Sequence, residues 1–72
     1  MPKPAHEPVT TFELIEFNHV RNMRGKEAAK IRVIEDGVPQ GFLWMSPDDI
    51  HANIRDFGHS DALDKALRAY GQ

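Results

Sequence analysis

Apolar and polar residues alternate over residues 28–35, which is the period of a β-strand with one buried face. One side is apolar and the other mostly basic: Ala29, Ile31 and Val33 against Lys30, Arg32 and Ile34. Asp36-Gly37 follows, and it supplies the two residues of positive φ that a type I′ turn requires. A second strand over residues 38–45 returns from this turn, so the pattern predicts a β-hairpin.

The two-residue turn predicts the register of this hairpin. It pairs residue 35 with 38, 33 with 40, 31 with 42 and 29 with 44. The expected core face is then Ala29, Ile31, Val33, Phe42 and Trp44. Leu43 falls on the opposite face, together with Lys30, Arg32 and Ile34. Since Pro39 cannot donate to a ladder, we expect the second strand to lie at an open edge of the sheet.

Residues 10–20 are rich in β-branched and aromatic side chains, which favours a third strand at this position. Its alternation is imperfect, because Phe12 and Leu14 point to one side while Ile15 and Phe17 point to the other. Either a β-bulge lies near Leu14 and Ile15, or both faces of the strand are buried. A helix capped at residue 10 or 11 is the alternative. A polar connection is expected over residues 21–25.

Two helix signals follow the hairpin. Ser46 is a good N-cap, Pro47 suits the first helical position, and Asp49 completes an approximate capping box. Apolar residues at 50, 54 and 57 form a stripe, and Gly58 ends the helix. A second helix over residues 60–70 has its stripe at 63, 66, 67 and 70. The sequence therefore predicts an α+β fold: a three-stranded antiparallel sheet (β-β-β) followed by two short C-terminal helices packed on one face.

The composition indicates one small domain over residues 10–72, preceded by a flexible proline-rich arm over residues 1–9. With 72 residues and no cysteine, the chain has no disulfide to compensate for a small core, so association is the remaining stabiliser. No apolar run is long enough to cross a membrane, and the first eight residues lack the apolar core of a signal peptide. We therefore expect a cytoplasmic protein with no membrane partner.

The net charge of −2 argues against a DNA-coating protein, but the charges are unevenly distributed. Residues 18–32 hold five basic residues and one acid, which leaves +4; residues 46–72 carry −2. The basic residues are Arg21, Arg24, Lys26, Lys30 and Arg32. They could bind phosphates or an acidic protein surface, or simply form a solvated face that protects an edge strand. The predicted register leaves this face without aromatic side chains, which weakens single-strand binding.

Catalytic chemistry has little support in the sequence. None of the four histidines has HxxxH or HExxH spacing, and Asp48 with His51, one helical turn apart, is better explained by a helix start and a solvent-facing side chain. Asp48 and Asp49 diverge by about 100° on a helix, so they do not converge on one atom. Ser46 is committed to capping. We predict a non-enzyme with no catalytic residue, no metal site and no cofactor.

Two helices can cover only one face of the sheet, which leaves an apolar patch rimmed by basic residues on the other face. Such a patch is typical of a partner surface, unless a bulge in the first strand makes it small. The candidate binding residues are Arg21, Arg24, Lys26, Lys30, Arg32, Ile34 and Leu43. A protein partner is expected, and homodimerisation is one form that the association could take.

The stretch from Phe42 to Tyr70 resembles the C-terminal part of small, mostly uncharacterised proteins encoded by phages and mobile elements. The pattern that carries the resemblance is Trp44-Met45-Ser46, Asp49-Ile50, Asn53-Ile54 and Phe57-Gly58. It covers less than half of the chain. In size, lack of cysteine and segregated charge, the chain also resembles the phage-encoded anti-CRISPR inhibitors, which share no common motif.

That resemblance implies a stoichiometric inhibitor that binds a larger host complex, such as a host nucleoprotein effector, and blocks nucleic-acid access or cleavage. The expected function is therefore a non-enzymatic protein-interaction module. The alternative is a small nucleic-acid-binding accessory protein that uses the basic segment 21–32.

Overall fold

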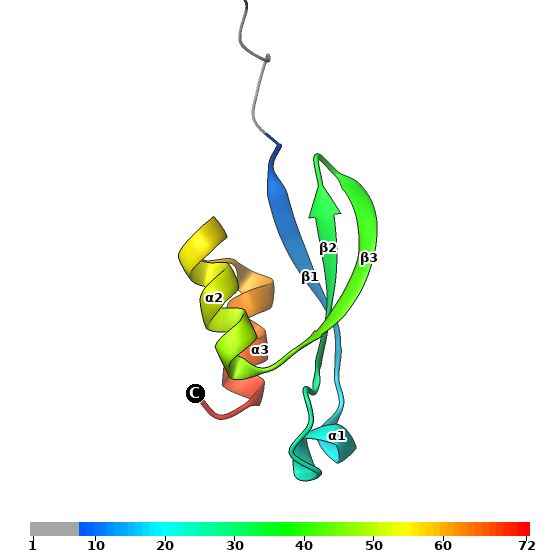
Figure 1. The fold of residues 1–72 in the computed structure, drawn as a ribbon, viewed down its shortest axis with the longest axis vertical. Helices are drawn as coiled ribbons and strands as arrows, with labels where there is room; N and C mark the ends of the chain where they lie inside the picture. Colours follow the sequence, from blue (N-terminus) through cyan, green and yellow to red (C-terminus); the bar gives the residue numbers. More distant parts are fainter. Residues whose placement is uncertain (1–7) are drawn as a thin grey trace, which may run out of the picture.

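A computed structural model describes residues 8–72, so most of the predicted arm, residues 1–7, lies outside the described residues (Figure 1). The elements in chain order are β1 (Thr10–Phe17), α1 (His19–Met23), β2 (Ala29–Glu35), β3 (Val38–Met45), α2 (Pro47–Phe57) and α3 (Asp61–Ala69). The strands form one antiparallel sheet in the order β1-β2-β3. The predicted fold class is confirmed.

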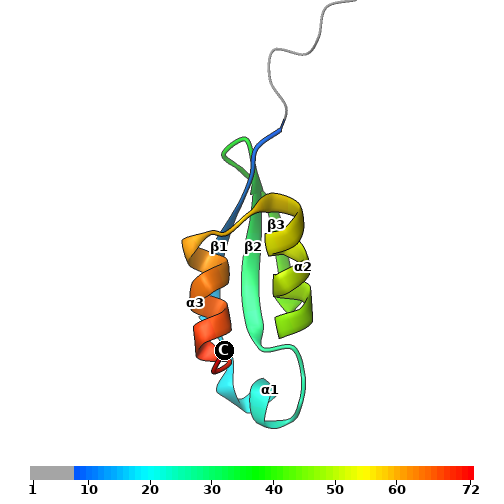
Figure 2. The ribbon, with the colours of Figure 1, turned by 90° about the vertical axis from the view of Figure 1, so that its left-hand side faces the viewer.

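The molecule has two layers, a sheet and a pair of helices. Both α2 and α3 lie on one side of the sheet, with α3 along β1 and α2 on the β3 side (Figures 1 and 2). Within residues 8–72, nothing covers the other side of the sheet (Figure 1). We call this side the uncovered face.

The first strand is confirmed, and the alternative of a helix at this position is wrong. Its register shifts between Leu14 and Glu16, so of the two alternatives, a bulge or burial on both faces, the structure has the bulge. The strand stops at Phe17, earlier than predicted, because Asn18 caps a short helix: its Oδ1 accepts a hydrogen bond from the Arg21 backbone N–H at 3.0 Å. Residues 19–23, expected as strand end and polar connection, form α1.

The hairpin turn is confirmed, but the register beyond it is wrong. Asp36 and Gly37 both have positive φ, 50° and 80°, as a type I′ turn requires. Ile34 then pairs with Pro39, whereas Val33 pairs with Gly41, so Gln40 is an extra residue in β3. Gly41 has φ 115°, a backbone conformation that is unfavourable for residues with a side chain. The glycine therefore allows the strand to form this bulge.

The bulge moves every later side chain of β3 to the opposite face. Met45 pairs with Ala29 and is buried beneath the helices, and Leu43 pairs with Ile31 on the same helix-covered side. Phe42 and Trp44, expected in the core, lie on the uncovered face. Leu43, expected on the uncovered face, lies on the helix side, although 56% of it remains exposed.

The core lies between the sheet and the two helices. Its largest fully buried side chains are Ile31, Met45, Ile50 and Leu63. Partly buried residues surround the core: Phe12, Leu14, Phe17, Ile54, Leu67 and Tyr70. The β1 bulge explains how Leu14 and Phe17, three positions apart, both reach this core.

Both predicted helix starts are confirmed. Ser46 Oγ accepts from the Asp49 N–H at 3.2 Å, and Asp49 Oδ2 accepts from the Ser46 N–H at 3.0 Å, which completes the capping box. Ser60 caps α3 by accepting from the Leu63 N–H at 3.2 Å. Ser46 is therefore engaged in starting a helix.

Tyr70 joins the end of α3 to the base of the hairpin. Its hydroxyl accepts from the backbone N–H groups of Ala28 at 2.7 Å and Ala29 at 3.2 Å, and donates to the Met45 carbonyl at 2.6 Å. Its ring packs edge-on against Phe17, with centroids 4.8 Å apart. This contact ties the helical layer to all three strands.

Candidate functional site on the uncovered sheet face

The uncovered face brings aromatic and basic side chains together. Cross-strand pairing places Lys30 opposite Trp44 and Arg32 opposite Phe42 on the same side of the sheet. We call the set Arg21, Lys30, Arg32, Phe42 and Trp44 the aromatic–basic face. Three of its members were predicted as site residues, whereas the two aromatic residues were not.

Lys30 lies over both aromatic rings. Its Nζ is 4.3 Å from the centroid of the Phe42 ring and 5.9 Å from that of the Trp44 ring. Each distance is within the range of a cation–π attraction, which contributes about 0.5–1 kcal/mol at exposed sites. Lys30 is therefore held by contacts with the two rings, and its positive charge is not neutralised.

Arg21 contacts one of these two rings, that of Trp44, from α1. Its guanidinium carbon lies 4.1 Å from the centroid of the Trp44 ring, and its Nε donates to the Glu27 carbonyl at 2.6 Å. The capping bond from Asn18 fixes the start of α1 and so positions Arg21. Residues 18–20, predicted as strand, and residues 21–23, predicted as a polar connection, thus form the cap and helix that place Arg21 in this candidate site.

Within residues 8–72, Arg32 is the one cation of this face that forms an ion pair with an acid. Its Nη1 lies 2.8 Å from Glu13 Oε1 on β1, and both side chains are substantially exposed. An exposed pair of this kind adds little to stability, but it offsets the charge of Arg32. Glu16 lies opposite Lys30 in the same register, so the face changes from aromatic residues on β3, through basic residues on β2, to the two acids Glu13 and Glu16 on β1.

The remaining predicted residues divide into three groups. Arg24 and Lys26 lie in the connection from α1 to β2, and their side chains form no hydrogen bond or ion pair with residues 8–72. Ile34 lies on the uncovered face toward the hairpin turn, since it pairs with Pro39. Leu43 lies on the opposite, helix-covered side of the sheet, away from the other predicted residues.

A sequence signal for the missed aromatic residues exists at Gly41. A glycine inside a strand often marks a bulge, and one extra residue exchanges the two faces of everything that follows. Because Phe42, Leu43, Trp44 and Met45 are all apolar, their alternation alone cannot show which pair is buried.

The histidines do not assemble into a site. His59 Nδ1 contacts Asp64 Oδ1 at 3.0 Å, His51 Nε2 contacts Gln72 Oε1 at 3.2 Å, and the His19 ring packs edge-on against Phe17. His6 lies outside the described residues. Within residues 8–72, no cluster of three or more histidine or acidic side chains could hold a metal ion.

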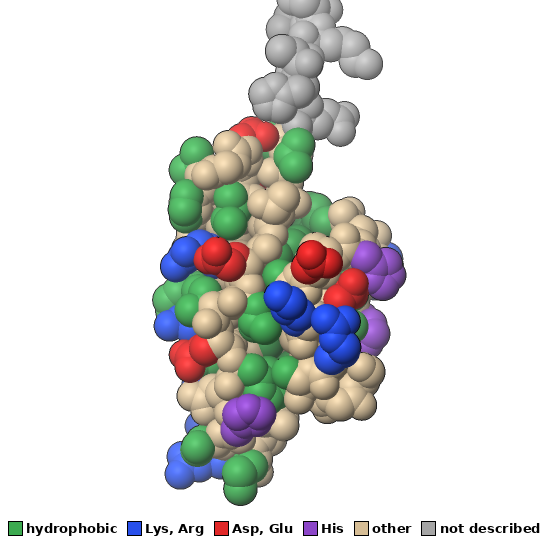
Figure 3. Space-filling view, turned by 180° about the vertical axis from the view of Figure 1, so that it is seen from behind, with side chains coloured by type: hydrophobic (Ala, Val, Ile, Leu, Met, Phe, Trp, Pro, Cys, Tyr) green, Lys and Arg blue, Asp and Glu red, His purple; other side chains and the backbone are tan. Residues whose placement is uncertain are grey.

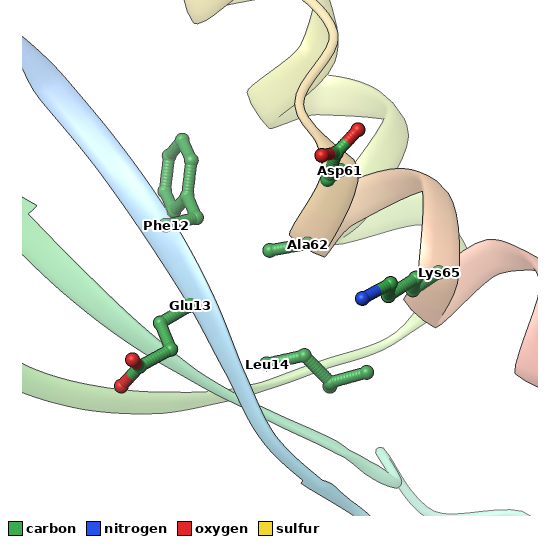
Figure 4. Close-up of a pocket in the computed structure, with 6 residues that line it drawn as sticks. All are labelled: Phe12, Glu13, Leu14, Asp61, Ala62 and Lys65. Carbon is green, nitrogen blue, oxygen red and sulfur yellow. The ribbon is translucent and has the colours of Figure 1, made fainter.

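A groove of about 420 Å³ lies between β1 and α3. It is lined by Phe12, Glu13, Leu14, Asp61, Ala62 and Lys65 (Figure 4). Glu13 points to the opposite side of β1 from Phe12 and Leu14, so it does not face Asp61 across the groove (Figure 4). Over this side of the molecule acidic and basic side chains lie next to one another, without a large area of one sign (Figure 3).

No protein-family model, no curated protein and no solved structure matches this chain. No helix within residues 8–72 is long and apolar enough to cross a membrane. The geometry of the aromatic–basic face is therefore the basis on which a function can be argued.

Proposed function

We propose that this chain is a non-enzymatic cytoplasmic binding protein whose aromatic–basic face binds single-stranded nucleic acid. The observation that carries the proposal is the position of Lys30 and Arg21 over Phe42 and Trp44 on the uncovered face. Aromatic side chains give bases a stacking platform, and neighbouring cations contact the phosphates. The nucleic-acid-binding alternative thereby gains stacking partners, which the predicted register had placed on the other face of the sheet.

The two rings are suitably placed for neighbouring bases. Phe42 and Trp44 are two positions apart on one strand, which separates them by about 7 Å along β3. In the free protein the cations lie over the rings, so we expect Lys30 to exchange its ring contact for a phosphate when a base stacks on Phe42. The side chains of Arg24 and Lys26, which form no hydrogen bond or ion pair within residues 8–72, would contact the nucleic acid beyond the edge of the sheet.

The single tryptophan makes this proposal directly measurable. Stacking on Trp44 should quench its fluorescence when short DNA or RNA oligonucleotides are added at low salt. Phe42→Ala keeps Trp44 as the fluorescent reporter and removes one of the two stacking rings. The affinity for the oligonucleotide should then fall by about 5- to 150-fold, the equivalent of about 1–3 kcal/mol per stacked base.

Phe57→Ala is the matched control, because Phe57 is 55% exposed, close to the 51% of Phe42, but belongs to α2. It should leave the affinity unchanged, with circular dichroism confirming that both variants fold. The proposal fails if neither DNA nor RNA changes the Trp44 emission or shifts in a mobility assay at low salt.

A protein partner is the second candidate, and the Arg32–Glu13 pair is the observation that favours it. Aromatic residues and arginine are enriched at protein interfaces, whereas an acid on the face opposes phosphate. In this proposal the chain is a phage-encoded inhibitor that binds a host nucleoprotein effector stoichiometrically. A purified complex that survives nuclease treatment and is lost on Arg21→Glu with Lys30→Glu would favour this candidate; a complex that disappears with nuclease would favour the first.

A further inference from the structure

The edge strand β3 has Pro39 and a bulge at its turn end, but its residues 41–45 carry no charged side chain that would protect the edge from pairing. Open edges are normally guarded by charged side chains, and β1, at the opposite edge, carries Glu13 and Glu16 together with a bulge. None of the eight residues of β3 is charged. Val38, Phe42 and Leu43 are 57%, 51% and 56% exposed.

The exposed apolar side chains of β3 lie on both sides of the sheet. Phe42 points to the uncovered face and Leu43 to the helix side, although they are adjacent in sequence. A partner lying on one face could bury only one of the two. A strand that pairs along the edge would cover both, because its own side chains alternate between the faces.

We propose that the β3 edge pairs with the β3 edge of a second copy of this chain, forming a two-fold symmetric dimer with a six-stranded sheet. Antiparallel pairing of a strand with its own copy is self-complementary, and an uncharged strand brings no like charges together. Pro39 and the bulge at Gln40 disturb the turn end of β3, so the pairing is centred on residues 41–45.

A second copy also fits the size and composition of the chain. With 72 residues and no cysteine, burial of apolar surface in a dimer supplies stabilisation that the single core lacks. The dimer does not depend on the nucleic-acid proposal. If both hold, Phe42 and Trp44 of the two copies lie side by side, and two short platforms become one continuous surface.

Sedimentation equilibrium of the whole chain from micromolar to millimolar concentration tests the pairing. The mass should rise from 8.2 kDa toward twice that value. Leu43→Lys and Phe42→Lys should each weaken association at least tenfold, because edge pairing buries a side chain on both faces. Met23→Lys changes a residue of α1 that is 86% exposed and should leave the dimer intact.

Circular dichroism spectra like those of the unsubstituted chain must accompany the two β3 variants. A mass of 8.2 kDa at every concentration would overturn the dimer. So would a dimer that Leu43→Lys disrupts and Phe42→Lys does not, because it would join through the helix side. A monomer whose Trp44 emission still responds to oligonucleotides would overturn the dimer alone and leave the proposed function standing.

Discussion

At the scale of single residues, two side chains far apart in sequence determine the structure of the aromatic–basic face and of the hairpin that carries it. Trp44 receives Arg21 and Lys30 over its ring, so three separate segments meet at one indole. Tyr70 satisfies two backbone donors and one acceptor at the base of the same hairpin. Each of these residues acts through long-range contacts, which a sequence pattern does not contain.

Tyr70→Phe should destabilise the fold by about 1–3 kcal/mol, because the Ala28 N–H and the Met45 carbonyl lose a partner within a partly buried region. The phenylalanine ring keeps the packing against Phe17, so the variant isolates the hydroxyl. Thermal unfolding followed by circular dichroism measures the loss. Leu67→Met, a volume-conserving change in the same helix, is the control; equal melting temperatures for all three proteins would contradict the assigned role.

At the scale of elements, two bulges decide which side chains face the helices. The extra residue in β1 lets Leu14 and Phe17 point to the same side, and the extra residue in β3 exchanges Phe42 and Trp44 for Leu43 and Met45. Without the second bulge, the uncovered face would have basic side chains but no aromatic platform. The aromatic–basic face therefore depends on the geometry of one segment, residues 39–41.

Gly41→Ala tests that geometry. No atom lies within 4 Å of the added Cβ, so the cost comes from the backbone at φ 115° and should be about 1–3 kcal/mol. Gln40→Ala is the matched control, since Gln40 is exposed and loses only a side-chain contact to the Val38 carbonyl. Chemical denaturation of both variants compares them. A Gly41→Ala protein as stable as Gln40→Ala would show that the bulge does not require this conformation.

At the scale of the whole molecule, charge is separated along the chain but nearly balanced in total. The segment 18–32 carries +4 within a protein whose net charge is −2. A protein of this kind exerts little long-range attraction on a polyanion, so the proposed binding to nucleic acid would depend on the few cations near the aromatic rings. This limits the number of phosphates that the face can contact.

The salt dependence of oligonucleotide affinity measures the number of phosphate contacts. If two to five cations contact phosphates of a single strand, the logarithm of the association constant should fall with the logarithm of salt concentration with a slope of about −1.4 to −3.5. Lys30→Gln should reduce the slope by about 0.7. Lys65→Gln, on α3 beside the groove, should leave it unchanged. A slope near zero would exclude phosphate contacts from the binding.

The sequence predicted the features that depend on neighbouring residues. The Asp36-Gly37 turn, the capping box of Ser46 and Asp49, and the cap at Ser60 are all confirmed, because each is formed by contacts within four residues. The local pattern also predicted a strand from residue 10, although it ends at Phe17 and not at residue 20, and gave the bulge as one of two alternatives. Together these features were sufficient for the fold class and for the existence of an uncovered face.

Only the tertiary structure decided what that face displays. Phe42, Leu43, Trp44 and Met45 form a continuous apolar run, so either alternate pair could be buried, and hydrophobicity does not distinguish them. Packing in the core determines which pair is buried, because Met45 packs with Ile50 and Leu63 beneath α2 and α3. The extra residue at Gln40 satisfies that packing and leaves Trp44 outside, where α1 brings Arg21 over it. Packing among elements distant in sequence, which no local pattern encodes, thus placed the aromatic residues of β3 beside the basic residues of β2.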